Sequence, residues 1–164
     1  MAYCFRLAKE NFKFSCTHFT IFGPSSAEKL HGHNYKVMFE FTCDKLLPDL
    51  AMAFDFNEIK PTMKNICDQL DESILVPTQS PYVQLKQDDK QVELFFADKT
   101  YRFPREDVHL LPIINVTVEA LAFYLHQEVQ KSFKSKWGIR NFAVTIEETD
   151  GQSVTFDDDV QQKR

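Results

Sequence analysis

The stretch that decides the fold is Leu30-His31-Gly32-His33-Asn34-Tyr35, which continues directly as Lys36-Val37-Met38-Phe39-Glu40-Phe41. From His31 onward every odd position carries a histidine, an aromatic or an aliphatic side chain, and most even positions are polar. This period-two alternation is typical of a half-buried β-strand. Because residues i and i+2 of a strand point to the same face, His31 and His33 share the inward face with the apolar residues that follow them.

A second run with the same alternation lies upstream. Its inward positions are Phe12, Phe14, Cys16 and His18. If the two strands pair antiparallel, His18 comes level with His31 and His33. Three histidines with an open fourth position are a common catalytic zinc arrangement, whereas structural zinc usually takes four ligands rich in cysteine. The pattern therefore predicts a Zn²⁺ site on these histidines. The alternative is that they are ordinary hydrogen-bonded residues at the edge of a core.

Length and composition indicate one domain with one core, because the chain has 164 residues, of which 43% are hydrophobic. We expect residues 1–156 to form this domain and residues 157–164 to be a polar tail. The net charge of −5, without a run of lysine or arginine, argues against a partner that is nucleic acid or a membrane surface. No apolar segment predicts a signal peptide or a membrane span. The four cysteines are irregularly spaced, which favours reduced thiols in a cytoplasmic protein.

Two amphipathic helices are predicted. The first follows Asn57, a candidate N-cap, and continues to Leu70; the second runs from Val118 to Phe133 with Thr117 as its cap. Helical spacing of apolar residues carries both predictions.

The remaining pattern is β-type. Tyr82–Phe103 contains three short runs separated by turn residues, which predicts a small meander of hairpins. Phe142–Glu148 alternates, and a short strand follows through Phe156. The segments 76–81 and 104–115 are expected to be loops. This order favours an α+β fold, an antiparallel sheet with helices on one face.

One carboxylate occupies an inward position. Glu148 has the apolar parity of its strand, whereas Glu147 has the opposite parity. An unpaired buried carboxylate is costly, so Glu148 needs a partner or an exposed strand end. The partner is either a nearby lysine or arginine, or a flat heterocycle whose adjacent N–H groups the carboxylate accepts.

The chain resembles the 6-pyruvoyl-tetrahydropterin synthase / 6-carboxy-tetrahydropterin synthase family. The matching blocks appear in family order between about residues 12 and 156: Phe14-Ser15-Cys16-Thr17-His18, Leu30-His31-Gly32-His33-Asn34-Tyr35, Phe54-Asp55-Phe56-Asn57-Glu58-Ile59-Lys60, Leu70-Asp71, Asn115-Val116-Thr117-Val118-Glu119 and Glu148-Thr149.

This resemblance implies a tunnelling fold, in which an antiparallel four-stranded sheet carries two helices on one face, with the hairpin region as an insertion. It also implies subunits that associate through their sheets into a hexamer, a dimer of trimers with active sites at subunit interfaces. The implied substrate is 7,8-dihydroneopterin triphosphate.

The resemblance also assigns roles to single residues. It implies zinc on His18, His31 and His33, and a pterin ring anchored by Glu148. Thr117 and Glu119 match positions that line the pterin pocket. Asp71 matches the acid of an Asp-His proton relay.

The chain departs from the family at two positions. The catalytic cysteine usually lies four or six residues before the first histidine of the H-G-H motif, where this chain has Ala27 and Ser25. The relay histidine after Asp71 is replaced by Glu72. Glu28 lies beside the missing cysteine and resembles a family branch in which a glutamate takes over acid-base duty, provided that burial tunes its pKa toward neutrality. The alternative for Glu28 is a solvated loop residue.

Three functions follow from this resemblance. The first is a zinc-dependent lyase that cleaves the substrate side chain to 6-hydroxymethyl-7,8-dihydropterin. The second is 6-carboxy- or 6-pyruvoyl-tetrahydropterin formation by an atypical site. The third is a catalytically silent pterin-binding homologue that kept the metal and lost the base.

Overall fold

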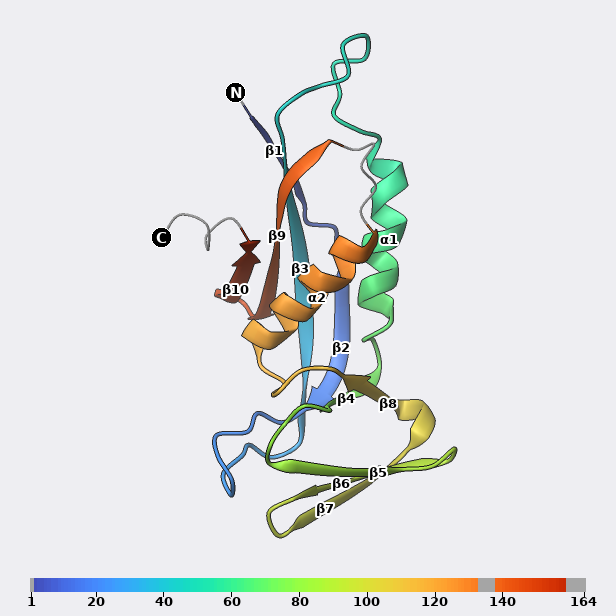
Figure 1. The fold of residues 1–164 in the computed structure, drawn as a ribbon, viewed down its shortest axis with the longest axis vertical. Helices are drawn as coiled ribbons and strands as arrows, with labels where there is room; N and C mark the ends of the chain where they lie inside the picture. Colours follow the sequence, from blue (N-terminus) through green and yellow to red (C-terminus); the bar gives the residue numbers. More distant parts are fainter. Residues whose placement is uncertain (1, 133–137, 159–164) are drawn as a thin grey trace.

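A computed structural model of the chain describes residues 2–132 and 138–158. A large sheet and two helices form the main body, and a smaller sheet lies at one end of the long axis (Figure 1). The large sheet has seven strands in the order β10-β9-β3-β2-β4-β8, with β1 also paired to β3. Its strands are β1 (Tyr3–Leu7), β2 (Lys13–His18), β3 (His31–Cys43), β4 (Ser73–Pro77), β8 (Val108–Leu111), β9 (Ile139–Thr149) and β10 (Gln152–Asp157).

The prediction of a four-stranded antiparallel sheet is wrong in its extent. β10, β9, β3 and β2 form a continuous antiparallel part, but β1 adds to β3, and β4 and β8 extend the sheet by parallel pairing. All of β8 and the last two residues of β4 fall in segments expected to be loops, and no strand was predicted at the rest of β4. Both are only four or five residues long and lie next to prolines, so their sequences show no alternation from which a strand could be recognised.

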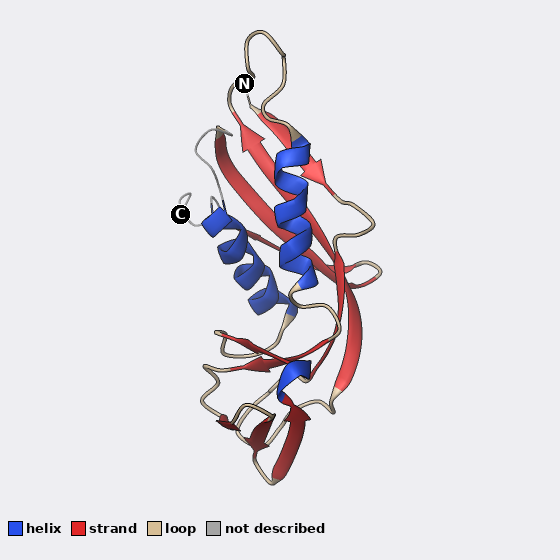
Figure 2. Ribbon diagram, turned by 90° about the vertical axis from the view of Figure 1, so that its right-hand side faces the viewer, coloured by secondary structure: helices blue, strands red, loops and turns tan. Residues whose placement is uncertain are grey.

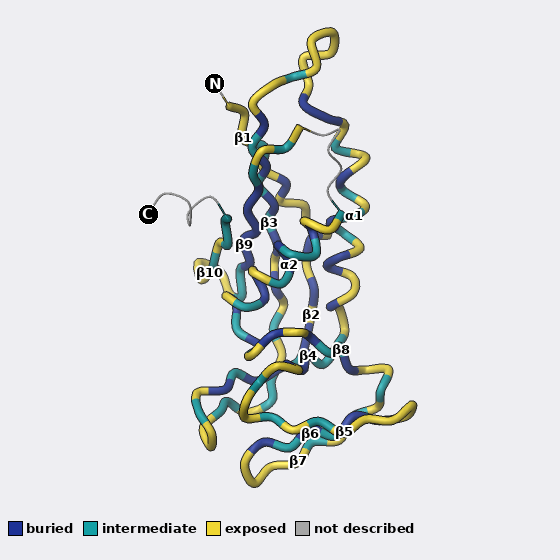
Figure 3. The backbone as a smooth tube through the Cα atoms, in the orientation of Figure 1, coloured by how far each residue is buried: buried dark blue, intermediate teal, exposed yellow. Residues whose placement is uncertain are grey.

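Helices α1 (Phe56–Asp68) and α2 (Val118–Ser132) cover the same face of the large sheet (Figure 2). The inward side chains of β3 from Tyr35 to Phe41 pack beneath them and are at most 3% exposed. Figure 3 shows the buried stretches of β3 and β9; burial alternates along β3, whereas the middle of β9 is buried continuously. The residues that follow His31 and His33 on their own face are therefore the centre of the main core.

The helix boundaries correct one predicted cap. Asp55, not Asn57, caps α1, because its side chain accepts a hydrogen bond of 2.8 Å from the backbone N–H of Asn57. Thr117 caps α2 as predicted, through a hydrogen bond of 3.2 Å from the N–H of Ala120 to Oγ1. The predicted end of α2 at Phe133 lies outside the described residues, as do residues 159–164 of the predicted tail.

The predicted meander is confirmed as a separate three-stranded antiparallel sheet. It consists of β5 (Val83–Gln87), β6 (Gln91–Phe96) and β7 (Lys99–Pro104), and the 3₁₀ turn η1 (Arg105–Asp107) leads from it to β8. This sheet has a core of its own, to which Phe19 and Ile21 contribute. The small sheet therefore packs against the segment that directly follows His18. No helix among the described residues is long and apolar enough to cross a membrane.

Candidate functional site

Three histidines meet where β2 ends and β3 begins. The two strands pair antiparallel, and the register sets His18 directly opposite His31. Alternation then brings His33 to the same face two residues further on. One ring nitrogen from each histidine lies within 4.8 Å of the others, and the Nε2 atoms of His31 and His33 are 2.9 Å apart. The antiparallel pairing of β2 and β3 was predicted, and it brings together the three histidine rings that the sequence pattern identified as candidate metal ligands.

Backbone carbonyls orient two of the rings. Nδ1 of His18 lies 3.1 Å from the carbonyl oxygen of Val116, and Nδ1 of His31 lies 2.7 Å from that of Lys29. A carbonyl oxygen only accepts, so each Nδ1 donates its proton and leaves a lone pair on Nε2. This is the arrangement that a metal-ligating histidine needs. Burial lowers the pKa of His18, which favours the neutral, ligating form. The donor set fits a divalent metal such as zinc.

Two carboxylates lie next to two different histidines of the cluster. Oε2 of Glu28 lies 3.9 Å from Nε2 of His31, and Oε1 of Glu148 lies 3.7 Å from Nε2 of His33. They reach the site from the loop before β3 and from the end of β9. The structure thus brings both predicted carboxylates to the predicted metal ligands.

The pKa of Glu28 is lowered, whereas burial was expected to raise it toward neutrality. Burial alone would raise the pKa of Glu28, but hydrogen bonds from Thr20 and the nearby rings of His31 and His18 outweigh it, so the pKa lies below its ordinary value. One of these hydrogen bonds is 3.0 Å from the backbone N–H of Thr20 to Oε2. Glu28 is therefore ionised at neutral pH, the form that can accept a proton, although the lowered pKa makes it a weaker base than a glutamate tuned toward neutrality.

Glu148 is held by uncharged donors. The hydroxyl of Tyr35 donates to its Oε1 at 2.8 Å, and the side-chain amide of Gln152 donates to Oε2 at 3.2 Å. Within the described part of the chain, no lysine or arginine nitrogen lies within 4.0 Å of this carboxylate, whereas Glu147 pairs with Lys36 at 3.1 Å. The lysine or arginine partner considered for Glu148 is absent among these residues.

Tyr35 belongs to the site, although the sequence argument placed it only in the core. Its hydroxyl also lies 3.1 Å from Nε2 of His18. Burial, followed by the hydrogen bond and charge of Glu148, raises the pKa of Tyr35 far above its ordinary range, so the hydroxyl stays a donor. Its position two residues after His33, on the same strand face, is the signal that could have identified it.

The other predicted site residues occupy different surroundings. Thr117 and Glu119 lie at the start of α2, next to the carbonyl of Val116 that orients His18. Oγ1 of Thr117 accepts a hydrogen bond from the backbone N–H of Ala120, and Glu119 is exposed. Oδ1 of Asp71 accepts a hydrogen bond of 2.7 Å from the N–H of Ser15. Ser15 lies three residues before His18, about 10 Å along the strand. Asp71 therefore does not join the histidine cluster within this chain.

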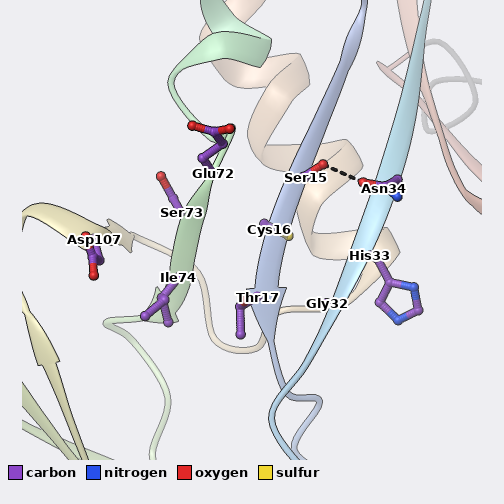
Figure 4. A pocket seen from close by; sticks show the side chains of 10 residues that line it. All are labelled: Ser15, Cys16, Thr17, Gly32, His33, Asn34, Glu72, Ser73, Ile74 and Asp107. Atoms are coloured by element: carbon purple, nitrogen blue, oxygen red, sulfur yellow. Dashed lines mark hydrogen bonds between the residues drawn. The ribbon is translucent and has the colours of Figure 1, made fainter.

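A cavity of about 380 Å³ lies on the other side of the same two strands. Of its lining residues on β2 and β3, Ser15, Thr17, Gly32 and Asn34 have the parity opposite to that of the histidines, whereas Cys16 and His33 have the same parity. Figure 4 shows the His33 ring pointing away from the other lining side chains. The cavity is thus distinct from the space that the three rings enclose.

Comparisons with known proteins agree with this geometry. Residues 7–159 match the family model of 6-pyruvoyl tetrahydropterin synthase. A protein of Methanocaldococcus jannaschii described as a "putative 6-carboxy-5,6,7,8-tetrahydropterin synthase" is 33% identical over 147 residues, which cover 88% of each chain.

Two solved structures are also similar. The 6-pyruvoyl tetrahydropterin synthase of Plasmodium vivax superposes with a TM-score of 0.85 at 25% identity, covering 96% of this chain and 98% of that one. A variant of the P. vivax enzyme with a catalytic glutamate replaced by alanine has a TM-score of 0.86, with the same identity and coverage. The family match spans nearly the whole chain and includes all three clustered histidines and both flanking carboxylates. The chain belongs to the 6-pyruvoyl tetrahydropterin synthase family, whose members are lyases of pterin biosynthesis.

Proposed function

We propose that this chain is a zinc-dependent lyase that cleaves the side chain of 7,8-dihydroneopterin triphosphate to give 6-hydroxymethyl-7,8-dihydropterin. The observation that carries the proposal is the position of Glu28. Its carboxylate lies 3.9 Å from a histidine of the cluster, on the loop where the family resemblance expects a cysteine and this chain has none.

The histidines would hold the metal through Nε2 of His18, His31 and His33. Bound zinc would supply a Lewis acid that polarises the side-chain oxygens of the substrate. The carbonyls of Val116 and Lys29 keep two of the rings in the ligating tautomer. His31 and His33 are partly exposed, with 36% and 22% of their side chains accessible, which leaves an open side for substrate.

Glu28 is the proposed base. Its lowered pKa keeps it ionised, so it can take a proton from the second hydroxyl of the substrate side chain. The bond between the two hydroxyl-bearing carbons then breaks, and the electron pair moves into the pterin ring. The carbon attached to the ring takes a proton to become the hydroxymethyl group, and the other fragment leaves as an aldehyde carrying the triphosphate. Every atom and electron is accounted for without an oxidant.

Cys16 is a poor alternative to Glu28 in this role. Cys16 is the nearest candidate by register, since it lies opposite His33. Burial, followed by the charges of Glu148 and Asp71, raises the pKa of Cys16 to about 12. A thiol with this pKa is protonated at neutral pH and is a poor base. This favours the glutamate-based reaction over a thiolate-based synthase reaction.

Glu148 is the proposed anchor for the pterin ring. Tyr35 and Gln152 fix the carboxylate by donating to it, while its remaining lone pairs can accept from adjacent ring N–H groups. We further propose that Thr117 and Glu119 line the pocket and that Asp71 acts in a site completed by another subunit.

One relative bears on the catalytic group and another on the product. In the P. vivax enzyme a glutamate is a catalytic residue, which supports a glutamate-based reaction here. The M. jannaschii relative is described as a 6-carboxy-tetrahydropterin synthase, which makes that product the second candidate. The two are separated by identifying the pterin released from 7,8-dihydroneopterin triphosphate by purified protein.

The metal assignment predicts about one zinc per chain. Replacing His31 and His33 together by alanine should abolish zinc retention, because it removes two of three ligands. His109→Ala is the matched control, since His109 lies on β8 outside the cluster and its loss should leave zinc content unchanged. Elemental analysis of the purified proteins measures this. Full zinc retention in the double variant would contradict the assignment.

The catalytic assignment predicts different consequences for the two carboxylates. Glu28→Gln should keep zinc and pterin binding but lower kcat by about 10²–10⁴-fold, the usual contribution of general acid-base catalysis. Glu148→Gln should also weaken pterin binding, because it removes an acceptor for the ring. Steady-state kinetics and pterin titration measure the two effects. A near wild-type rate in Glu28→Gln would show that Glu28 is not the base.

We also propose a hexamer, a dimer of trimers. The large sheet ends at β8 and β10, whose outer edges carry backbone groups available for pairing with another subunit. Light scattering at micromolar concentration should give about six times the 19.2 kDa chain mass. A monomeric mass would count against this assembly and against a site completed by another subunit.

A further inference from the structure

We propose that Asn115 is a positioning residue that holds the Glu28 carboxylate at the histidine cluster. This inference rests on the proposed function, because it assigns Asn115 a role through the proposed base. The evidence lies in residues 19–28, called here the Glu28 hairpin, and in the two parts of the molecule between which this hairpin is held.

The backbone of Thr20 places the Glu28 side chain. The N–H of Thr20 donates to Oε2 of Glu28 at 3.0 Å, and the N–H of Glu28 donates back to the carbonyl of Thr20 at 3.0 Å. Ile21 bridges Ala27 across the same hairpin. Whatever fixes the backbone at Thr20 and Ile21 therefore fixes the carboxylate near His31.

The side chain of Asn115 makes two hydrogen bonds to this backbone. Its Nδ2 donates to the carbonyl of Ile21 at 2.8 Å, and its Oδ1 accepts from the N–H of Ile21 at 3.0 Å. A carboxamide has the donor and acceptor needed to satisfy both groups of one residue, whereas a carboxylate has no donor. The next residue, Val116, accepts from the Thr20 hydroxyl at 3.3 Å and from Nδ1 of His18 at 3.1 Å. One short segment thus fixes a metal-ligand candidate and the hairpin that carries the base.

The other side of the hairpin is held by the small sheet. The side chains of Phe19 and Ile21 are 6% and 8% exposed and belong to the second core. Phe19 stacks on Tyr101 of β7, with ring centroids 5.5 Å apart. The tip beyond Ile21 is different, since Phe22 is 66% exposed. The position of Glu28 thus depends on Ile21, whose side chain is fixed by the small sheet and whose backbone is fixed by Asn115.

The test compares Asn115→Ala and Asn115→Asp with Asn141→Ala in the zinc-loaded protein. Asn141 is a matched control, because it also makes a half-buried side-chain hydrogen bond, 2.9 Å from Nδ2 to Oδ1 of Asp157, on β9 away from the hairpin. We expect both Asn115 variants to lower kcat about tenfold with KM changed less than threefold and zinc content unchanged. Asn141→Ala should keep kcat within twofold. Asn115→Asp keeps the size and the acceptor, so it serves if Asn115→Ala does not fold.

Two further measurements separate positioning from general loss of stability. In a Glu28→Gln background, adding Asn115→Ala should lower kcat by less than twofold, because the group that Asn115 positions is already gone. Hydrogen exchange of the Ile21 amide should accelerate at least tenfold in Asn115→Ala, which removes the acceptor of this amide. Exchange of the Glu28 amide should accelerate at least tenfold in both Asn115 variants, with or without metal, and neither amide should exchange faster in Asn141→Ala.

Wild-type kcat in the folded Asn115 variants, or unchanged exchange at Ile21 and Glu28, would overturn the inference. A full tenfold loss in the Glu28→Gln background would also overturn it. Failure of the proposed function is seen separately: Glu28→Gln would then turn over at the wild-type rate, while the Asn115 variants would still show the expected acceleration of exchange.

Discussion

The antiparallel register of β2 and β3 is the constraint on which the site depends. It places His18 opposite His31 and leaves all three histidines on the face that the helices cover. A slip of one residue would turn every side chain of one strand to the other face and separate the rings. Two contacts specify the register: Phe14 stacks on Tyr35 with centroids 5.0 Å apart, and Gly32 lies where a Cβ would be 3.3 Å from the carbonyl oxygen of Cys16. A side chain at Gly32 would require the Cys16 carbonyl to move by a few tenths of an ångström, next to the strand pair that carries the histidines.

Residues from other parts of the chain complete the site around the three histidines, because they orient His18 and hold Glu148 in place. Val116 lies 98 residues from His18 in sequence, and Glu148 lies 113 residues from Tyr35, yet both contacts are hydrogen-bonding distances. The site therefore exists only when α2 and β9 are packed on the β2–β3 pair. The small sheet adds to this framework, because its core takes up the side chains that follow His18. The proposed zinc ligands, base and ring anchor thus depend on a single folded unit.

Much of this could be predicted from the sequence, because the signals are local and periodic. The alternation from His31 to Phe41 predicts the central strand, and the three runs of Tyr82–Phe103 predict the small sheet. The inward parity of Glu148 predicts either a partner or an exposed strand end. The strands β1, β4 and β8 were not predicted, since each is short and is recognisable only by the strand it pairs with. The cap of α1 was misplaced by two residues because Asp55 and Asn57 are both good caps, and only the backbone decides between them.

Contacts between segments that are distant in sequence account for the remaining differences between the sequence-based predictions and the structure. The pKa of Glu28 was expected to rise through burial, but the N–H of Thr20 and two neighbouring rings lower it. Asp71 was expected near the catalytic groups, and within this chain it binds the backbone of Ser15 instead. The roles proposed for Tyr35 and Asn115 rest on hydrogen bonds of the Tyr35 hydroxyl to Glu148 and of the Asn115 side-chain amide to the backbone of Ile21. Alternation and helical spacing identify inward positions but not these partners.

Anomalous diffraction from crystals of the zinc-loaded protein, collected at the zinc absorption edge, is the most direct test of the central claim. The account predicts one peak per chain about 2.0–2.1 Å from Nε2 of each of His18, His31 and His33. A peak on other residues, or none at these histidines in protein shown to contain zinc, would contradict it.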